Sequence, residues 1–484
     1  MKDRLTKTAY LRYLKCPQEF WLEYHQPLLV AEPITLEYEH LRQQGYAVQQ
    51  LAKRLRRFVP SDEYTVDFER PFQNAEFYAR SDISVTENAT GLIDLYETKS
   101  AASVKAEHID DIAFQAMVAE GNGFTVGRCF VITMNGDYIR AGEIDPEQLF
   151  VVSDVTEQVR ELMRSTIERA QNARAYLETV PVPSLVDYCA ENKLDCSFIK
   201  MHFPDLPEYT VFDIAFLKNE KRRDLLSQGI VSITDVPDDY PLSAKQRLQV
   251  SVAKLGEIQI DRDEIVKRVE GWEYPLQFLD YETFAYAIPQ FDGLKPFQQM
   301  CFQYSLHTID APGAEPRHDF FLSRGDGEPP RALAESLKKA MSGGIGNVFV
   351  WYESFEKTRN SEMAAMFPEH AAFFEEVNSK TQDLMKIFSE NLYIHPEFKG
   401  RSSIKKVLPV LVPELSYKDL GIGDGMTATI SWFRAVKWET LSNEERETIF
   451  SDLEKYCELD TVAMVEIFRH LVALVPLRSA VVTS

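Results

Sequence analysis

The chain has 484 residues, 45% of them hydrophobic, which is enough to bury more than one core, so we expect two large domains. The formal net charge of −22 excludes a passive nucleic-acid coat, because such proteins bind phosphate through clustered Lys and Arg, but it does not exclude an enzyme whose acidic site is neutralised by divalent cations. Neither a run of about 18 apolar residues nor a signal-peptide pattern occurs, which predicts a cytoplasmic protein without membrane contact.

The first domain is predicted to be α/β and to span residues 1–205. Apolar residues at three-to-four spacing predict helices up to about residue 60, and alternating patterns between turn residues predict a strand-rich stretch after them. The predicted strands are 64–68, 78–85, 91–99 and 126–134, with a hairpin turn at 87–91. The predicted helices that follow the first strands are 108–120 and 157–177.

A smaller helical segment, residues 206–271, is expected to join the two domains. Its short helices around Gly229 and Pro237 resemble a helix-hairpin-helix, which offers backbone amides and basic residues to phosphates. A helical linker with an ordinary solvated basic face explains the pattern equally well. A second α/β domain, residues 272–484, begins with a predicted strand at 276–280. The linker residues expected to contact nucleic acid are Lys218, Lys221, Arg222 and Arg223.

Three residues with catalytic chemistry lie on predicted strands of the first domain. Glu97 and Lys99 are separated by one residue and therefore face the same side of a strand, and Asp82 lies on the neighbouring strand of the hairpin. Carboxylates are hard ligands that suit Mg²⁺, and hydrolysis of a phosphodiester also needs a cation near the attacking water or the phosphate. We expect Asp82 and Glu97 to bind metal and Lys99 to be catalytic.

The ordered series around these residues resembles the RecB-like branch of the PD-(D/E)XK nucleases, which includes CRISPR-associated adaptation nucleases, over about residues 5–205. The resemblance implies a restriction-endonuclease-like fold and a catalytic role for Gln115. This chain has Gln49 where the family commonly has a histidine ligand, so a structural remnant is the alternative to an active site. The matching features are the segment 5–10, Cys16-Pro17, Trp21, Gly45, Asp82, Glu97, Lys99 and Gln115.

The same resemblance implies a metal centre made by cysteines. Six cysteines spread over the chain are too sparse for a disulfide scaffold, so they are thiols or metal ligands. In the RecB-like branch one N-terminal cysteine and three later ones often hold a 4Fe–4S cluster, and His202 stands where the last of these is expected. Cysteine with histidine can hold a cluster or Zn²⁺. The implied ligands are Cys16, Cys189, Cys196 and His202; the alternative is buried thiols and a surface histidine.

The second domain carries acidic residues at two distant places in the sequence. Asp280 and Glu282 face the same side of the strand that begins at Leu276, whereas Tyr456 and Asp460 are four apart and so lie one above the other on a helix. Carboxylates that meet are destabilising unless cations bind between them. This combination is therefore hard to explain as core packing.

The pattern resembles the DEDD exonucleases of the ribonuclease-H-like fold over about residues 272–475. The resemblance implies two metal ions roughly 4 Å apart and hydrolysis of DNA or RNA from the 3′ end. Asp280, Glu282 and Asp460 would be metal ligands. Tyr456 would orient or help to deprotonate the attacking water.

The resemblance also implies a middle acid, for which there are two candidates. Glu356 stands where an aspartate after an aromatic residue is usual, and Asp383 lies where related exonucleases also carry an acid. We expect Glu356 to be a ligand and Asp383 to support it closely, although Asp383 would equally suit the cap of a helix at 384–389. Lys405 is expected to contact substrate phosphate, with a solvated basic turn as the alternative.

The order of the two halves is similar to that of a bacterial family in which a RecB-like domain is fused to a DEDD-type domain. We expect a nuclease that uses Mg²⁺ or Mn²⁺ and acts on nucleic-acid ends in repair or defence, with DNA preferred over RNA. One alternative is a single-site 3′–5′ exonuclease whose first domain only binds nucleic acid. The other is a nucleic-acid-binding scaffold in which both sites are degenerate.

Overall fold

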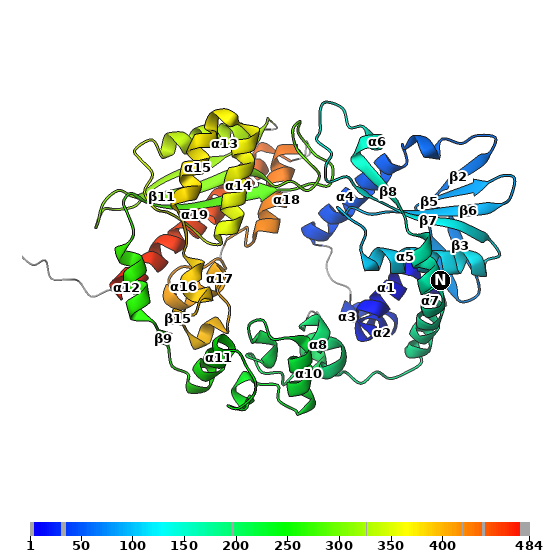
Figure 1. Cartoon of the computed structure of the whole chain (residues 1–484), viewed down its shortest axis with the longest axis horizontal. Coiled ribbons are helices and arrows are strands. Elements are labelled where there is room, and N and C mark those ends of the chain that lie inside the picture. The colour runs from blue at the N-terminus through cyan, green and yellow to red at the C-terminus, as the bar shows by residue number, and fades with distance from the viewer. Residues whose placement is uncertain are drawn as a thin grey trace, which may run out of the picture. The chain divides into compact units, whose positions relative to one another are not determined.

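The computed structural model describes residues 4–30, 35–194, 198–325, 327–418, 420–437 and 441–474, and it has a mixed α/β architecture (Figure 1). The chain forms two compact units. Unit 1 comprises Met1–Ser184 and Ala285–Gln298, and unit 2 comprises Leu185–Phe284 and Gln299–Ser484. The chain therefore passes between the units after Ser184, after Phe284 and after Gln298.

Unit 1 is built on a five-stranded mixed sheet whose strand order is β2-β5-β6-β7-β8. Only β6 and β7 pair in parallel, and the other neighbours are antiparallel. The strands are β2 (Tyr64–Phe68), β5 (Ile83–Glu87), β6 (Leu92–Thr98), β7 (Thr125–Met134) and β8 (Phe150–Asp154). The predicted strands at 64–68, 91–99 and 126–134 and the turn at 87–91 are confirmed, and Gly91 closes this turn with a φ of 72°.

The predicted strand at 78–85 is wrong as a single element. It is divided between β4 (Phe77–Arg80), which pairs with β1 (Leu5–Thr6) and β3 (Pro71–Gln73) in a separate three-stranded sheet, and β5. Ser81 and Asp82 form the crossing, where Ser81 N donates to Arg70 O and Asp82 O accepts from Glu69 N. Alternation continues through the crossing, so the sequence pattern does not show the change of sheet.

Helices cover both faces of the five-stranded sheet. Leu95 and Val131 face a core formed with α1 (Lys7–Lys15), α5 (Ala106–Gly121) and α7 (Thr156–Leu177). Tyr96 and Ile132, one residue further along each strand, face a second core that includes α4 (Leu36–Ala52) and Ala287 from the inserted segment. Because side chains alternate along a strand, Glu97 must share the face of Leu95 and point toward α5.

Unit 2 begins with a helical module that contains α10 (Asn219–Ser227) and α11 (Ala244–Leu255). Leu185, Val186 and Ala190 pack into the core of this module. For this reason unit 1 ends at Ser184, before the boundary expected at residue 205.

The main sheet of unit 2 has the strand order β12-β11-β10-β13-β14. The first three strands are antiparallel to their neighbours, and β10, β13 and β14 are parallel. The strand predicted at 276–280 is confirmed and extends further, to Phe284. The strands are β12 (Arg317–Leu322), β11 (Met300–Ile309), β10 (Leu276–Phe284), β13 (Val348–Val350) and β14 (Thr381–Asp383).

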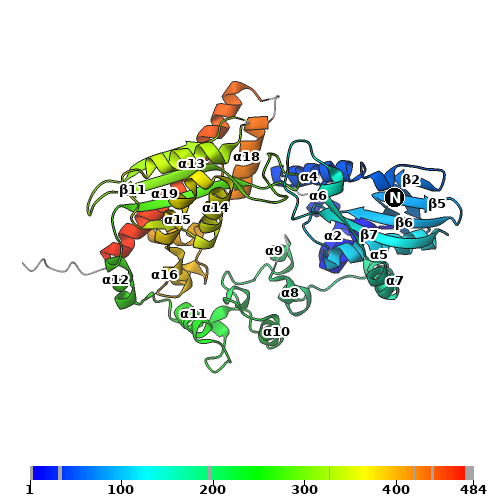
Figure 2. The same cartoon turned by 45° about the horizontal axis from the view of Figure 1, so that its top comes forward.

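The two faces of β10 meet different helices, several of which are labelled in Figure 2. Leu279 and Tyr281 pack against α13 (Pro329–Ala340), α14 (Glu353–Met366) and α15 (Ala371–Lys380). Leu276 and Phe278 pack against α19 (Asn443–Ala473), the longest described helix, which starts at a Ser442–Glu445 capping box. Asp280 and Glu282 continue the second face, so they point toward α19. No helix in the described ranges is long and apolar enough to cross a membrane.

Candidate functional site

The structure brings together three of the acids predicted for the second domain. One carboxylate oxygen from each of Asp280, Glu282 and Asp460 lies within 4.8 Å of the other two. Strand alternation places the first two on the face that meets α19, and the hydrophobic residues around Asp460 seat that helix on the sheet. Distant segments of the sequence thus converge on a single cluster of oxygen atoms.

Burial and mutual repulsion dominate the electrostatics of this cluster. Burial raises the pKa of Asp280 and of Glu282 well above their usual values, and neighbouring carboxylates raise them further. Burial also raises the pKa of Asp460 to about 6. Three carboxylates in this environment favour a bound cation, because a cation compensates both the lost hydration and the repulsion.

The polar groups around the acids come from α17 (Ile404–Leu411), from the chain after it and from α19. Tyr417 Oη donates to Asp460 Oδ1 at 2.5 Å, and Cys457 Sγ donates to Asp280 Oδ2 at 3.6 Å. Lys405 Nζ donates to Gly423 O at 2.6 Å and to Tyr456 Oη at 3.3 Å. The charge of Lys405 lowers the pKa of each of the three acids.

Tyr456 therefore lies beside the acids, as predicted, and Lys405 is close enough to influence them. Sequence reasoning missed Tyr417. This residue lies before α19, and no sequence pattern links a residue so far from Asp460 to its carboxylate. Sequence reasoning also missed Cys457, whose burial next to Asp280 follows from its place beside Tyr456 on the same helix.

Glu356 is in the first turn of α14 and is 2% exposed. Burial raises the pKa of its carboxyl, and the charge of Asp280 raises it further. Among the described residues, Glu356 Oε2 has no hydrogen-bond partner, an arrangement that costs free energy unless a cation or water satisfies the oxygen. Glu356 is not one of the three acids whose oxygens lie within 4.8 Å of one another.

Asp383 has a structural task of its own at the end of β14. Its carboxylate accepts hydrogen bonds from the backbone N–H groups of Tyr352, Glu353 and Met385, at 3.0 to 3.2 Å. These bonds hold the starts of α14 and of α16 (Met385–Ser389). The capping role considered for Asp383 from the sequence is therefore present.

The donor atoms of the main cluster suit Mg²⁺ or Mn²⁺. All are oxygens, which hard divalent cations prefer, and the unpaired Glu356 Oε2 offers one more. Lys405 lowers the pKa of Glu282, but burial and the neighbouring Asp280 and Asp460 raise it more, so the charge of Lys405 does not compensate the cluster. The residues present therefore fit divalent cations.

A second acidic cluster forms in unit 1, around Glu97. Lys7 Nζ and Lys99 Nζ both contact Glu97 Oε1 at 2.9 Å. Both lysines also contact Asp111, Lys7 at 3.1 Å and Lys99 more closely. Gln115 Nε2 donates to Glu97 Oε2 at 2.7 Å and to Asp111 Oδ1 at 2.9 Å. Glu97, Lys99 and Gln115 thus meet, as predicted.

Sequence reasoning missed Lys7 and Asp111 in this cluster. Asp111 is four residues before Gln115 on α5, a spacing that places both on one helix face and could have revealed it. Lys7 comes from the first turn of α1 and is brought to Glu97 only by the tertiary fold.

Asp82 lies next to this cluster, but its carboxylate is held by other partners. Asp82 Oδ1 accepts from Gln49 Nε2 at 2.8 Å, and Asp82 Oδ2 accepts from Thr98 N at 2.8 Å. Gln49 thus binds the predicted metal ligand Asp82 directly.

The two neighbouring aspartates differ in pKa. Burial and the charge of Glu97 raise the pKa of Asp82 to about 7. The two lysines lower the pKa of Asp111 to about 2 despite its burial.

A cavity of about 660 Å³ adjoins the unit 1 cluster. Its lining includes Lys99 and Asp111 together with Arg12, Lys15 and His108 from α1 and α5. Glu19, Glu107 and Asp110 also line the cavity, so it carries charges of both signs and gives a polar ligand access to the predicted catalytic lysine.

The implied cysteine centre is only partly described. Cys16 precedes α2 (Pro17–His25) in unit 1, whereas Cys189 and His202 belong to unit 2. Cys196 lies outside the described residues. Burial lowers the pKa of His202, whose Nε2 has no hydrogen-bond partner in the ranges given above. The cluster stays a prediction.

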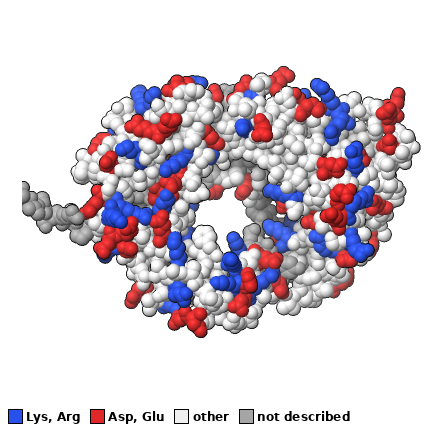
Figure 3. All heavy atoms as spheres, in the orientation of Figure 1, with Lys and Arg blue, Asp and Glu red and all other residues white. Residues whose placement is uncertain are grey.

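The basic residues of the helical module differ in burial and in their hydrogen-bond and ion-pair partners. Arg222 is 2% exposed and donates to Ala190 O, Leu217 O and Asn219 Oδ1, so its predicted contact with nucleic acid is wrong. Lys221 donates to Pro241 O, Arg223 pairs with Glu191, and Lys218 is exposed. Acidic and basic side chains are interspersed over both units on the face shown in Figure 3.

Comparisons with known proteins match only part of the chain. Residues 277–403, which include Asp280, Glu282 and Glu356, match a family model described as "Domain of unknown function (DUF2779)". The chain is 28% identical over 215 residues to "Uncharacterized protein UU173" of Ureaplasma parvum, and 27% identical over 209 residues to "Uncharacterized protein MG366" of Mycoplasma genitalium. Each match covers 39% of this chain, and the chain spans about 30% of the length of these relatives.

Proposed function

We propose that this chain is a metal-dependent nuclease with two acidic sites, which hydrolyses phosphodiester bonds at nucleic-acid ends, with DNA as the preferred substrate. The observation that carries the proposal is the convergence of Asp280, Glu282 and Asp460 within 4.8 Å. No hydrophobic or structural need explains buried carboxylates that repel one another in this way.

The strand order of the unit 2 sheet supports a ribonuclease-H-like domain of the DEDD type. Three antiparallel strands followed by two parallel ones place Asp280 and Glu282 on the central strand β10, opposite the helix that carries Asp460. Divalent cations bound by such acids would stabilise charge on the phosphate and lower the pKa of water. In this proposal Tyr456 orients the attacking water, and Lys405 attracts the phosphate.

The mixed sheet of unit 1 supports a RecB-like nuclease domain in the same way. Glu97 would bind metal, Asp111 is a further candidate ligand, and Gln115 fixes the carboxylates of both. Lys99 would polarise the phosphate or the attacking water. Lys7 and Lys99 already compensate these carboxylates, so a metal would have to displace at least one ammonium group.

That last observation also favours a second candidate, a one-site exonuclease whose unit 1 only binds nucleic acid. Gln49 adds to it, since an amide replaces the usual histidine ligand and binds Asp82. The two candidates differ in whether Lys99 contributes to hydrolysis.

Purified full-length Asp280→Asn, Lys99→Ala and doubly substituted proteins can be compared on end-labelled DNA and RNA with Mg²⁺ or Mn²⁺. Two active sites predict that each single variant keeps one class of product and that the double variant makes none. Full activity of Lys99→Ala beside an inactive Asp280→Asn would instead identify a one-site enzyme. Glu466→Gln, which changes a partly buried acid of α19 that pairs with Arg469, is the matched control. If the wild-type chain neither cleaves these substrates nor binds Mn²⁺ in calorimetry, the proposal is wrong.

A further inference from the structure

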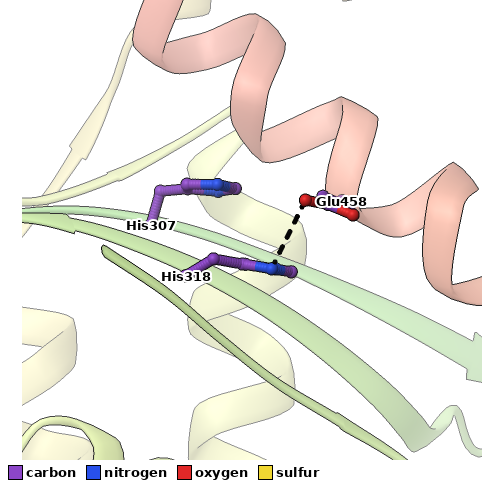
Figure 4. A group of neighbouring side chains, drawn as sticks. All are labelled: His307, His318 and Glu458. Atoms are coloured by element: carbon purple, nitrogen blue, oxygen red, sulfur yellow. Dashed lines mark ion pairs between the residues drawn. The ribbon is translucent and has the colours of Figure 1, made fainter. Parts of the chain in front are cut away.

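A second group of metal-binding side chains lies on unit 2, across α19 from the acids. His307 on β11 pairs in register with His318 on β12, and their rings stack with centroids 4.4 Å apart. Glu458 of α19 faces them, and its Oε1 is 3.5 Å from His318 Nδ1 (Figure 4). One ligand atom from each of the three residues lies within 4.8 Å of the other two.

Hydroxyl groups hold one nitrogen of each imidazole. His307 Nδ1 is 2.8 Å from Thr461 Oγ1, and His318 Nε2 is 2.9 Å from Ser305 Oγ. The two hydroxyls are themselves 2.7 Å apart. This pairing leaves His307 Nε2 and His318 Nδ1 as the ring atoms that can bind an ion. Histidine ligands are usually oriented through the opposite ring nitrogen in this manner.

The chemistry of the group differs from that of the acid clusters. Two imidazoles and one carboxylate form a borderline-soft set, which selects zinc-like transition metals over Mg²⁺. Burial lowers the pKa of His307 and of His318. At Zn–N distances of about 2.0–2.1 Å, two tetrahedral ligands lie about 3.3 Å apart, so ligand atoms that lie within 4.8 Å of one another must turn toward a shared ion to bind it.

We propose that His307, His318 and Glu458 bind one divalent transition-metal ion of the zinc type, with a fourth position left to solvent. His318 and Glu458 have side chains that are 23% and 46% exposed, so an ion can reach the site. The bound ion would fasten α19 to the β11–β12 hairpin. Glu458 lies between Tyr456 and Asp460 in sequence, so the same helix presents one face to the acids and another to this site.

Binding of Zn²⁺ and Co²⁺ to chelator-treated full-length protein tests the proposal without an activity assay. In excess Mg²⁺, the wild-type protein should bind one Co²⁺ with the visible absorption of a nitrogen-coordinated ion. His318→Gln and Glu458→Gln should weaken binding at least tenfold. Asp280→Asn should leave this site intact while it weakens Mn²⁺ binding, which separates the two centres.

Glu466→Gln and His395→Gln are the matched controls, since both residues lie away from the group and should not change the Co²⁺ signal. Glu458 is only partly buried, so its variant is expected to fold even if a histidine variant does not; circular dichroism checks this. Wild-type protein that binds no Zn²⁺ or Co²⁺ at micromolar concentrations would overturn the proposal. So would Glu458→Gln and His318→Gln proteins that bind as tightly as the wild type.

Discussion

In the proposed nuclease, the Tyr456 hydroxyl is the side-chain group that would orient the attacking water. It lies 3.3 Å from Lys405 Nζ, and the Lys405 ammonium also lies over the Tyr456 ring. Tyr456→Phe keeps the ring and removes only the hydroxyl. We expect kcat to fall about 10²-fold or more, because a positioned proton-transfer group typically contributes that much. Mn²⁺ affinity should be unchanged, so calorimetry beside single-turnover cleavage distinguishes a catalytic effect from a structural one.

The raised pKa of Asp460 makes the metal-free protein sensitive to pH. Its carboxyl titrates near pH 6 in the folded chain and near 3.8 when unfolded, so the folded state holds its proton more tightly. This contribution to stability is therefore complete below about pH 3.8 and is lost as the pH rises through 6. In chelator, Asp460→Asn should make unfolding less dependent on pH between about 4 and 7 than in the wild type. Equal pH dependence of the melting temperatures would contradict this.

At the scale of elements, substitutions of Asp383 and of Glu356 are expected to have opposite effects: the first should lower stability, and the second should weaken metal binding. Asp383→Ala removes the acceptor for three backbone N–H groups at two helix starts, so the free energy of unfolding should fall by about 2 kcal/mol. Glu356→Gln keeps the shape of the side chain but replaces a carboxyl group that can bind a cation, so it should keep stability and weaken Mn²⁺ binding. Urea unfolding and calorimetry on both variants measure the two effects. A stable Asp383→Ala protein with lost Mn²⁺ binding would reverse the assignment.

The residues that share one face of a strand or helix could be predicted from the sequence, whereas contacts between distant elements could not. Alternation along β10 placed Asp280 and Glu282 on one face, and four-residue spacing placed Tyr456 and Asp460 on one helix face. No local pattern shows that His307 lies opposite His318, because that contact depends on the register of β11 with β12. Lys7 was missed for the same reason, since only packing of α1 brings it to Glu97.

At the scale of the whole molecule, the segment Ala285–Gln298 belongs to unit 1 although the chain before and after it belongs to unit 2. Arg140 Nη1 donates to Pro289 O at 2.9 Å and to Gln290 O at 2.8 Å, which fixes this segment to unit 1. Arg140→Ala should therefore speed proteolytic cleavage within the segment, as mapped by mass spectrometry. Arg128→Ala, at an exposed arginine of unit 1, is the control and should leave the rate unchanged. Identical cleavage of both variants would show that the apolar contacts of Ala287 are sufficient.

The segment Ala285–Gln298 starts close in sequence to an acid of the candidate metal site. It leaves unit 2 directly after Phe284, the last residue of β10, and Glu282 is only two positions earlier. The loop that joins β10 to β11 of unit 2 thus belongs to unit 1. Only Thr283 and Phe284 separate Glu282 from this loop, so a substitution in the first residues of the loop would change the backbone next to an acid of the candidate metal site.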